Sequence, residues 1–285
     1  MNKIGILSII KNEHQYLDEW IQYHLLLGID KIYLFEDVDS DSHKDICDKY
    51  SNVICDSILS TYKDEKIKNN IISNKRNHLA PAGYQVSFMR NCLDYIKAND
   101  DLDWVTYIDV DEFLTLENKD GSIHSIMNEF SNYSIVVLQW INYNASGFIH
   151  KPDLSVLDAY HDKCKLACAS MSQIASSKLM FNMHTGNFIR CNHHIPMFKN
   201  GWCKTDFSTD IKNVVYDKLY IRHYITKSFE EYCYKIFLRG QFFRSKGLNH
   251  FFEFNPSMDR NNKEIIAITN KYYDMFMNGK LNYYI

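Results

Sequence analysis

The sequence has the composition of an ordinary folded protein. Its 285 residues (33.7 kDa) are 46% apolar and 24% charged, and only 10 Gly and 4 Pro argue against a disordered or linker-rich chain. The formal net charge of −3 offers no general attraction to polyanions. Nucleic acid is therefore not an expected partner.

The apolar residues near the N-terminus do not form a targeting segment. The run over 3–10 leads directly into Lys11, Asn12 and Glu13, which makes it too short for a signal peptide, and no run reaches the ~18 to 20 apolar residues of a membrane span. The 8 Cys are scattered. We therefore expect a cytoplasmic protein with reduced thiols.

Strand and helix patterns alternate along the first half of the chain. Short apolar runs typical of buried strands occur at residues 4–10, 31–35, 53–55, 104–108 and 135–140. Helical patterns occur at residues 12–28, where Asn12 is the expected N-cap, and at 45–50 and 85–98. The polar stretch 62–77 has no clear period and is interpreted as a loop. The alternation predicts an α/β fold with a mostly parallel sheet covered by helices.

The second half is less regular. A strand is expected over 219–225, and Ser228 with Glu231 forms a capping-box pattern at the start of a helix that ends at Gly240. Capping this helix is enough to explain a glutamate at position 231, so no functional role is expected for Glu231.

Polar residues follow three of the predicted strands: Asn12 with Glu13, Asp37 with Asp39, and Asp109 with Asp111. Ligands of open parallel sheets bind beyond the carboxyl ends of the strands. Two carboxylates one residue apart can hold a hard divalent cation whose other positions take phosphate oxygens. This pattern is common among solvated loops, but its place after an apolar strand favours a metal site.

Three segments resemble bacterial glycosyltransferases related to families 2 and 92. They are Lys11-Asn12-Glu13 with Leu17-Asp18-Glu19-Trp20-Ile21, Tyr23-His24 and Leu27-Gly28-Ile29; Trp104 through Ile108-Asp109-Val110-Asp111-Glu112-Phe113-Leu114; and His223-Tyr224 with Lys227-Ser228, Glu230-Glu231 and Arg239-Gly240. The resemblance covers about two thirds of the chain. It implies a GT-A fold, a nucleotide-sugar donor, and Mn²⁺ or Mg²⁺ at the acidic pair. On this basis residues 1–225 are the expected catalytic domain, and 226–285 are a helical extension packed on it.

The resemblance also implies roles for single residues. Asp111 is expected to bind the metal directly, Asp109 to bind the metal through water or to contact the ribose, and His223 to be a third ligand, because imidazole suits Mn²⁺ better than Mg²⁺. A half-buried strand histidine is the alternative for His223.

Further residues are expected to bind the nucleotide. Asn12 and Glu13 after the first strand and Asp37 after the second lie where the uracil and ribose are held, although the family usually has Asp-Asn-Gly-Ser where this chain has Asp37-Val38-Asp39-Ser40. Lys178 is expected to neutralise diphosphate charge, with a surface lysine as the alternative. Gln85 matches a family position whose partner is unknown.

An inverting transfer needs a carboxylate that takes the proton of the acceptor hydroxyl. Asp158 is the expected base. The donor is expected to be a UDP-hexose, and the acceptor a polysaccharide or lipid-linked oligosaccharide of the bacterial cell surface. Aromatic and basic residues near the C-terminus would suit peripheral contact with a membrane. An alternative for that region is a helical pair that closes the core.

Two other classes of protein remain as alternatives. An aspartyl-type phosphatase also uses Asp-x-Asp at a strand end, but normally on the first strand. A non-catalytic sugar-binding protein would use aromatic residues and would not need Asp109, Asp111 and His223 together. Release of free nucleotide from a sugar donor separates the glycosyltransferase from a sugar-binding protein.

Overall fold

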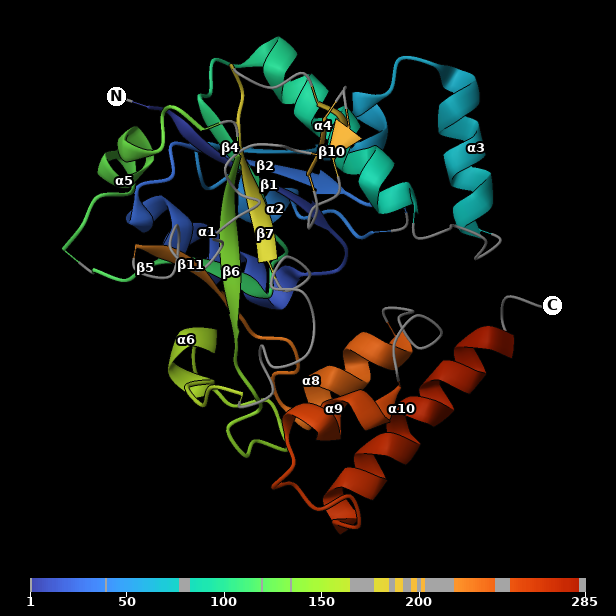
Figure 1. Ribbon diagram of the computed structural model, residues 1–285. Helices are drawn as coiled ribbons and strands as arrows, with labels where there is room; N and C mark the ends of the chain where they lie inside the picture. Colours follow the sequence, from blue (N-terminus) through green and yellow to red (C-terminus); the bar gives the residue numbers. More distant parts are fainter. Residues whose placement is uncertain are drawn as a thin grey trace. The chain divides into compact units, whose positions relative to one another are not determined.

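A β-sheet organises the described part of the chain (Figure 1). Its strands are hydrogen-bonded in the order β3-β2-β1-β4-β7-β6-β11-β5. They are β1 (Ile4–Ile10), β2 (Lys31–Glu36), β3 (Val53–Ser57), β4 (Trp104–Tyr107), β5 (Glu112–Leu116), β6 (Ile135–Asn142), β7 (Ser177–Asn182) and β11 (Leu219–His223). A smaller sheet pairs β8 (Phe188–Cys191), β9 (Pro196–Phe198) and β10 (Gly201–Trp202).

The structure is a computed structural model that describes residues 2–38, 40–76, 83–118, 120–133, 135–164, 177–184, 188–191, 196–198, 201–202, 218–238 and 247–281. The chain forms two compact units: Met1–Trp140 with Ser170–Ile221, and Ile141–Ala169 with Arg222–Ile285. Helices of the first unit are α1 (His14–Leu27), α2 (Lys44–Cys47), α3 (Glu65–Arg76), α4 (Gly83–Asn99) and α5 (Ile123–Glu129). Those of the second are α6 (Val156–Ala159), α8 (Phe229–Cys233), α9 (Leu248–Phe254) and α10 (Lys263–Leu281).

The first four strands form the parallel part of the sheet. β1 pairs in parallel with both β2 and β4, and β2 pairs in parallel with β3. β7 runs antiparallel to β4 and to β6. Every residue of β4, and all but one of β1, is buried, which explains why these strands are continuous apolar runs in the sequence. The predicted α/β class is confirmed.

The C-terminal end of helix α1 was predicted correctly and its N-terminal end was not. Gly28 ends the helix in the left-handed conformation (φ 102°), as its place after the apolar pattern indicated. Asn12, however, is not the N-cap: Glu13 occupies that position and makes no side-chain capping bond. The Asn12 side chain instead accepts a hydrogen bond from Asp41 N at 2.9 Å, because Asn12 adopts a positive φ of 52° that turns it toward that loop.

Two further elements differ from the expectation. The stretch 62–77, interpreted as a loop, contains helix α3, whose Ile71 is 3% exposed and packs into the core. One buried side chain in a polar helix gives too weak a periodicity to be recognised. Residues 112–116 form β5, which follows β4 after a short turn. The sequence shows the end of β4 clearly but not the start of this next strand.

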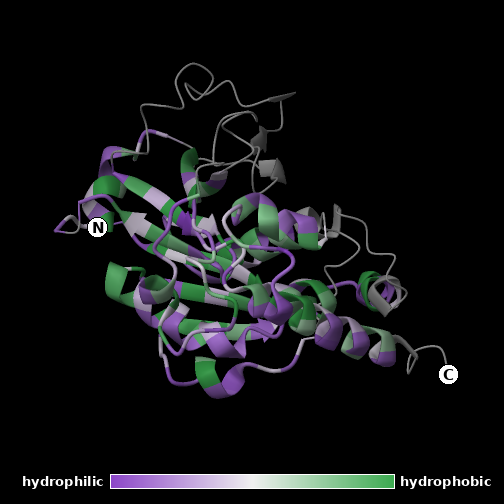
Figure 2. Cartoon of the chain, turned by 90° about the horizontal axis from the view of Figure 1, so that it is seen from below, coloured by the Kyte–Doolittle hydropathy of each residue, from purple (hydrophilic) through white to green (hydrophobic). Residues whose placement is uncertain are grey.

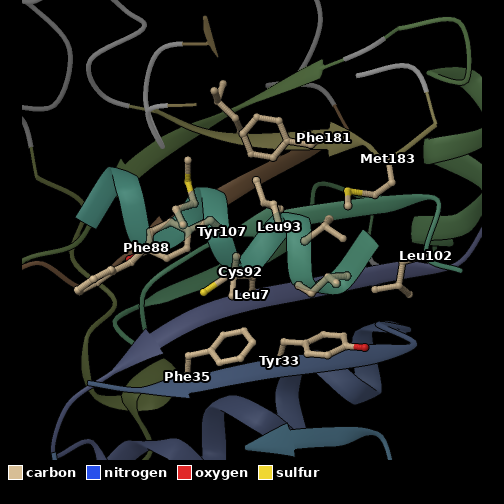
Figure 3. Packing of buried hydrophobic residues seen from close by; sticks show 14 of the residues in the cluster. Leu7, Tyr33, Phe35, Phe88, Cys92, Leu93, Leu102, Tyr107, Phe181 and Met183 are labelled. Carbon is tan, nitrogen blue, oxygen red and sulfur yellow. The ribbon is translucent and has the colours of Figure 1, made fainter. Parts of the chain in front are cut away.

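Helix α4 and the sheet share one apolar core. Figure 3 shows Phe88, Cys92 and Leu93 of α4 in one cluster with Leu7 of β1 and Phe35 of β2. The helix predicted over 85–98 lies within α4. In Figure 2 the helices carry both hydrophobic and hydrophilic segments, as expected when only one face of each helix is covered. None of the described helices is long and apolar enough to cross a membrane.

The second unit has its own aromatic core. Phe229 and Tyr232 of α8 pack with Phe251 of α9 and Ile265 of α10, and Ala145 joins the same cluster. Ala145 N also donates to Asn255 Oδ1 at 2.7 Å. This compact unit comprises Ile141–Ala169 and Arg222–Ile285. The expected division into a catalytic domain over 1–225 and an extension over 226–285 stays a prediction. The break between Ile221 and Arg222 lies close to that predicted boundary.

The capping box at the start of α8 is confirmed. Ser228 Oγ accepts a hydrogen bond from Glu231 N, and Glu231 accepts one from Ser228 N at 3.1 Å. The Tyr160 hydroxyl also donates to Glu231 Oε2. Glu231 is therefore fully engaged in holding the helix terminus.

Candidate active site

The carboxyl ends of β1, β2 and β4 carry most of the predicted site residues. β1 lies between β2 and β4, and the three strands are parallel, so the residues that follow them emerge at one edge of the sheet. Asn12 and Glu13 follow β1, Asp37 follows β2, and Asp109 follows β4.

Asn12 ties the end of β1 to the loop after β2. Its backbone N–H donates to Ser40 Oγ at 3.2 Å, and its side-chain oxygen accepts from Asp41 N. Asp37 N extends the pairing of the two strands by donating to the Ile10 carbonyl at 2.9 Å, and Asp37 Oδ1 accepts from Val38 N at 2.8 Å. The two loops thus form one hydrogen-bonded edge.

A histidine missed in the sequence supports the same edge. His43 is fully buried, and its Nε2 accepts the backbone N–H of Glu13 at 2.9 Å, while Nδ1 lies 3.3 Å from Glu36 Oε1. The ring stacks on His14 at 4.0 Å. Burial, together with His14, lowers the pKa of His43 despite the opposing effect of Glu36. A neutral ring that accepts from Glu13 N therefore holds the loop after β1.

The turn between β4 and β5 is highly acidic. We call residues 109–112 the acidic turn. Asp109 Oδ2 accepts a hydrogen bond from Lys178 Nζ at 2.7 Å, and Asp109 Oδ1 accepts one from the Tyr107 hydroxyl at 3.2 Å. The turn closes on itself, because Asp109 N donates to Glu112 Oε2 at 2.8 Å. Asp111 lies between these residues and is partly exposed.

Glu112 and Lys178 are buried beneath the acidic turn. Lys178 is 1% exposed and Glu112 is 0% exposed, with Nζ 3.2 Å from Oε2. Burial raises the pKa of Glu112 to about 8, and Asp109 and Asp111 add to this effect while Lys178 opposes it. Burial alone would lower the pKa of Lys178, but the charges of Asp109 and Glu112 outweigh it and raise that pKa. The Lys178 ammonium thus forms ion pairs with two carboxyl groups of the acidic turn, those of Asp109 and Glu112.

Helix α1 holds the strand that follows the acidic turn. Trp20 Nε1 donates to the Glu112 carbonyl at 2.7 Å, and the Tyr23 hydroxyl donates to the Leu114 carbonyl at 2.9 Å. His24 Nε2 accepts from Leu114 N at 3.1 Å, while its Nδ1 donates to the Trp20 carbonyl at 2.8 Å. Burial lowers the pKa of His24 to about 3, so the ring is neutral and can accept. We call Trp20, Tyr23 and His24 the α1 clasp.

His223 lies in the second unit and is 8% exposed. Its Nδ1 lies 2.9 Å from Asn142 Oδ1, and its carbonyl accepts from Tyr143 N at 2.9 Å. Because the amide oxygen accepts the Nδ1 proton, the Nε2 lone pair faces away from Asn142. A metal-ligating histidine is commonly oriented by this kind of bond. Sequence reasoning missed this contact, because the two residues lie 81 positions apart in the chain.

The remaining predicted residues have these positions. Asp158 is exposed on α6, where its N–H donates to the N-cap Ser155 Oγ at 3.1 Å and its Oδ2 accepts from that hydroxyl at 2.7 Å. Gln85 belongs to helix α4, but its side chain lies outside the described part of the structure. Asp39 also falls outside the described residues.

The acidic turn has the chemistry of a shared cation site. Within the described ranges, no group of three or more His, Cys, Asp and Glu side chains is arranged to hold a metal ion by itself. Ions such as Mg²⁺ are, however, often held by one or two carboxylates together with substrate phosphates and water. Asp109 and Asp111 fit that kind of site, in which oxygens of a bound diphosphate would complete the coordination.

Comparison with known proteins identifies the family. The model of glycosyltransferase family 92 matches residues 7–276, so the chain belongs to this family. A curated relative, a family 92 protein of Ricinus communis, is 24% identical over 163 residues, which is 56% of this chain. The matched part spans only 26% of that longer protein.

Solved structures give more distant matches. Glucosyl-3-phosphoglycerate synthase from Mycobacterium tuberculosis, solved with Mn²⁺, UDP and phosphoglyceric acid, is 12% identical with a TM-score of 0.36 over 64% of this chain and 56% of that chain. HddC from Yersinia pseudotuberculosis is 11% identical with a TM-score of 0.31, over 65% of this chain and 78% of that one. Likenesses this distant assign neither a ligand nor an activity.

Proposed function

We propose that this protein transfers a hexose from a UDP-sugar to a saccharide acceptor, with Mn²⁺ or Mg²⁺ bound at the acidic turn. Membership of family 92 supports the class of reaction. The observation that carries the metal proposal is the acidic turn itself, where buried Lys178 and Glu112 hold Asp109 at the end of β4. Such an arrangement is costly to bury and is more typical of a functional site than of a solvated loop.

In this proposal Asp111 binds the ion directly, and Asp109, already hydrogen-bonded by Lys178 and Tyr107, contacts it through water or contacts the ribose. His223 is a proposed further ligand, because its bond to Asn142 leaves Nε2 as the coordinating nitrogen. The bound ion would stabilise the negative charge that develops on the leaving diphosphate.

The proposed donor pocket uses the edge formed by the loops after β1 and β2. Asn12 and Asp37 fix the backbone of these loops, and Glu13 is held by His43. Carboxylates at this edge can accept hydrogen bonds from ribose hydroxyls or from the uracil N–H. Gln85 and Lys178 are further proposed donor-binding residues. For Lys178, binding the diphosphate requires that the ammonium give up a bond to Asp109 or share it.

We assign the proposed base role to Asp158. Its carboxylate takes the acceptor hydroxyl proton while the new bond to the sugar C1 forms and the C1–oxygen bond to UDP breaks, which inverts the configuration. Asp158 is exposed, so an acceptor can reach it. The hydrogen bond that the carboxylate accepts from Ser155 belongs to the cap of α6.

The proposed acceptor is a polysaccharide or lipid-linked oligosaccharide at the bacterial cell surface, made on the cytoplasmic side with peripheral membrane contact. In the described part of α10, exposed Ile266, Tyr273 and Met277 would support that contact. Co-sedimentation with anionic vesicles tests this part alone, and a protein that stays in the supernatant at low salt contradicts it.

Calorimetry tests the donor and the metal together. UDP, GDP and CMP are each titrated in the presence of Mn²⁺, and UDP-hexoses are then incubated with the protein while released UDP is measured. We expect a preference for UDP that is lost in Asp111→Asn. Asp120→Asn, an exposed aspartate of the same unit, is the matched control and should change nothing. Preference for CMP, or Mn²⁺ dependence that survives in Asp111→Asn, contradicts the proposal.

A further inference from the structure

We propose that Lys178 and Glu112 are a pair of positioning residues that fix the carboxylate of Asp109 and so set the metal affinity of the acidic turn without touching the ion. The inference rests on the proposed function, because it concerns the metal site of that reaction. Lys178 would then position Asp109, in addition to the predicted contact with diphosphate. Glu112, for which the sequence predicted no role, would position Asp109 as well.

The pair is buried to a degree that surface ion pairs are not. Lys178 on β7 reaches Asp109 Oδ2 at 2.7 Å and Glu112 at 3.2 Å, and both members of the pair are shielded from solvent. The ammonium also lies 4.8 Å from the ring centre of Tyr107 and 5.9 Å from that of Trp140. Carboxylates and aromatic faces thus surround Nζ and fix its position.

The pair acts on Asp109 at two points. Lys178 binds the side-chain Oδ2, and Glu112 Oε2 accepts the backbone N–H at 2.8 Å. The Tyr107 hydroxyl binds the other side-chain oxygen, Oδ1. Asp109 is therefore oriented by the protein before any ligand arrives. Among the described residues, none forms a hydrogen bond with the buried Glu112 Oε1. Keeping this carboxyl group therefore costs stability, as expected for a residue with a functional role.

A double variant separates the effect of orienting Asp109 from the effect of the net charge of the acidic turn. Lys178→Met with Glu112→Gln removes one cation and one carboxyl while keeping an acceptor for Asp109 N. If Glu112 is ionised, the net charge of the turn is unchanged. If Glu112 is neutral, the turn becomes more negative and attracts a cation more strongly. The net negative charge of the turn thus stays equal or rises, so a fall in affinity points to the lost hold on Asp109.

A matched control exists at the other end of the sheet. Lys31 at the start of β2 pairs with Asp100 at 2.5 Å, and both lie in the first unit. Lys31→Met with Asp100→Asn removes a less buried Lys–Asp pair and tests whether any loss of stability alone affects metal binding. Circular dichroism and thermal unfolding confirm that each variant is folded.

The experiment titrates Mn²⁺ alone into the full chain by calorimetry. We expect binding by the wild type, loss in Asp111→Asn, about 10-fold weaker binding in the Lys178/Glu112 double variant, and affinity within about twofold of wild type in the Lys31/Asp100 control. Wild-type affinity in the first double variant overturns this inference and leaves the proposed function intact. The titration is repeated with saturating UDP, because diphosphate oxygens complete the proposed site. No Mn²⁺ binding by the wild type in either titration, or full binding by Asp111→Asn, overturns both.

A second variant covers the case in which the double variant does not fold. Tyr107→Phe removes only the hydroxyl that donates to Asp109 Oδ1 and preserves the ring beside Lys178. We expect Mn²⁺ affinity to fall about threefold, the lower part of the range for one hydrogen bond. Unchanged affinity would mean that the orientation of Asp109 does not set metal binding, and the inference would be wrong.

Discussion

Trp20 Nε1 donates a hydrogen bond to the carbonyl oxygen of Glu112 at 2.7 Å, although 92 residues separate the two in sequence. Glu112 is both the last residue of the acidic turn and the first residue of β5. The contact therefore links the buried face of α1 to the point where the turn ends, and it makes the α1 clasp part of the support of the candidate site.

Removing this bond should destabilise the protein. Trp20→Phe leaves a buried carbonyl without its donor, so we expect the free energy of unfolding to fall by about 1 to 3 kcal/mol. Urea unfolding measures the change. Tyr50→Phe, which removes the bond from the partly buried Tyr50 hydroxyl to Asp18, should cost less than about 0.5 kcal/mol. Equal effects of the two substitutions would contradict a special role for Trp20.

His24 should make stability depend on pH. Its pKa is lowered to about 3 from the ordinary value of 6.5 because the ring is fully buried. Between these values the unfolded chain binds a proton that the folded protein does not, so this contribution to stability is present above about pH 6.5 and is lost as the pH falls toward 3. Through His24 the free energy of unfolding changes by at most about 1.4 kcal/mol per pH unit.

The measurement compares wild type with His24→Gln. Glutamine offers a donor and an acceptor but does not titrate. Urea unfolding between about pH 4.5 and 6.5 should show a shallower dependence on pH in the variant, because other groups contribute equally to both proteins. Parallel curves would show that His24 does not titrate differently in the folded and unfolded states.

Asp158 gives a prediction that separates catalysis from helix capping. Asp158→Asn should lower sugar transfer at least about 100-fold while leaving affinity for Mn²⁺ and UDP unchanged, because a general base acts in the chemical step. Ser155→Ala removes the cap and should cost about 1 kcal/mol of stability while most turnover remains. Normal transfer by Asp158→Asn would place the base elsewhere.

Asn142 should affect the metal through His223. If His223 is a ligand, Asn142→Leu removes the acceptor of its Nδ1 proton and should weaken Mn²⁺ binding about 10-fold or more. Asn144→Ala, which removes the bond to Ser146 N in the following loop, is the control. Calorimetry measures both. A His223→Ala variant that binds Mn²⁺ like the wild type would remove this histidine from the ligand set.

The parts of the fold that are encoded locally were predictable. β1, β2 and β4 are buried apolar runs, Gly28 marks the end of α1, and Ser228 marks the start of α8. Each depends on residues within a few positions of one another. The polar residues at the strand ends were found for the same reason, because each follows its strand directly in the sequence.

The supporting contacts of the candidate site could not be predicted in this way. Lys178 lies 69 residues from Asp109 in sequence, and Leu114 lies 90 residues from His24. The side chains meet only after strand order and register are fixed. Asn12 was misassigned because its left-handed backbone directs the side chain to Asp41, and the conformation of a single asparagine is not visible in a sequence pattern.

The α1 clasp also limits how far β5 can move when a ligand binds. Three side chains of one helix bind the backbone of β5 at Glu112 and Leu114, so sliding or rotating that strand would break several buried hydrogen bonds at once. The strand and α1 are thereby expected to behave as a rigid body. Lys178, Tyr107 and Glu112 also hold Asp109, so an incoming ligand is expected to meet a carboxylate that is already in place at this turn.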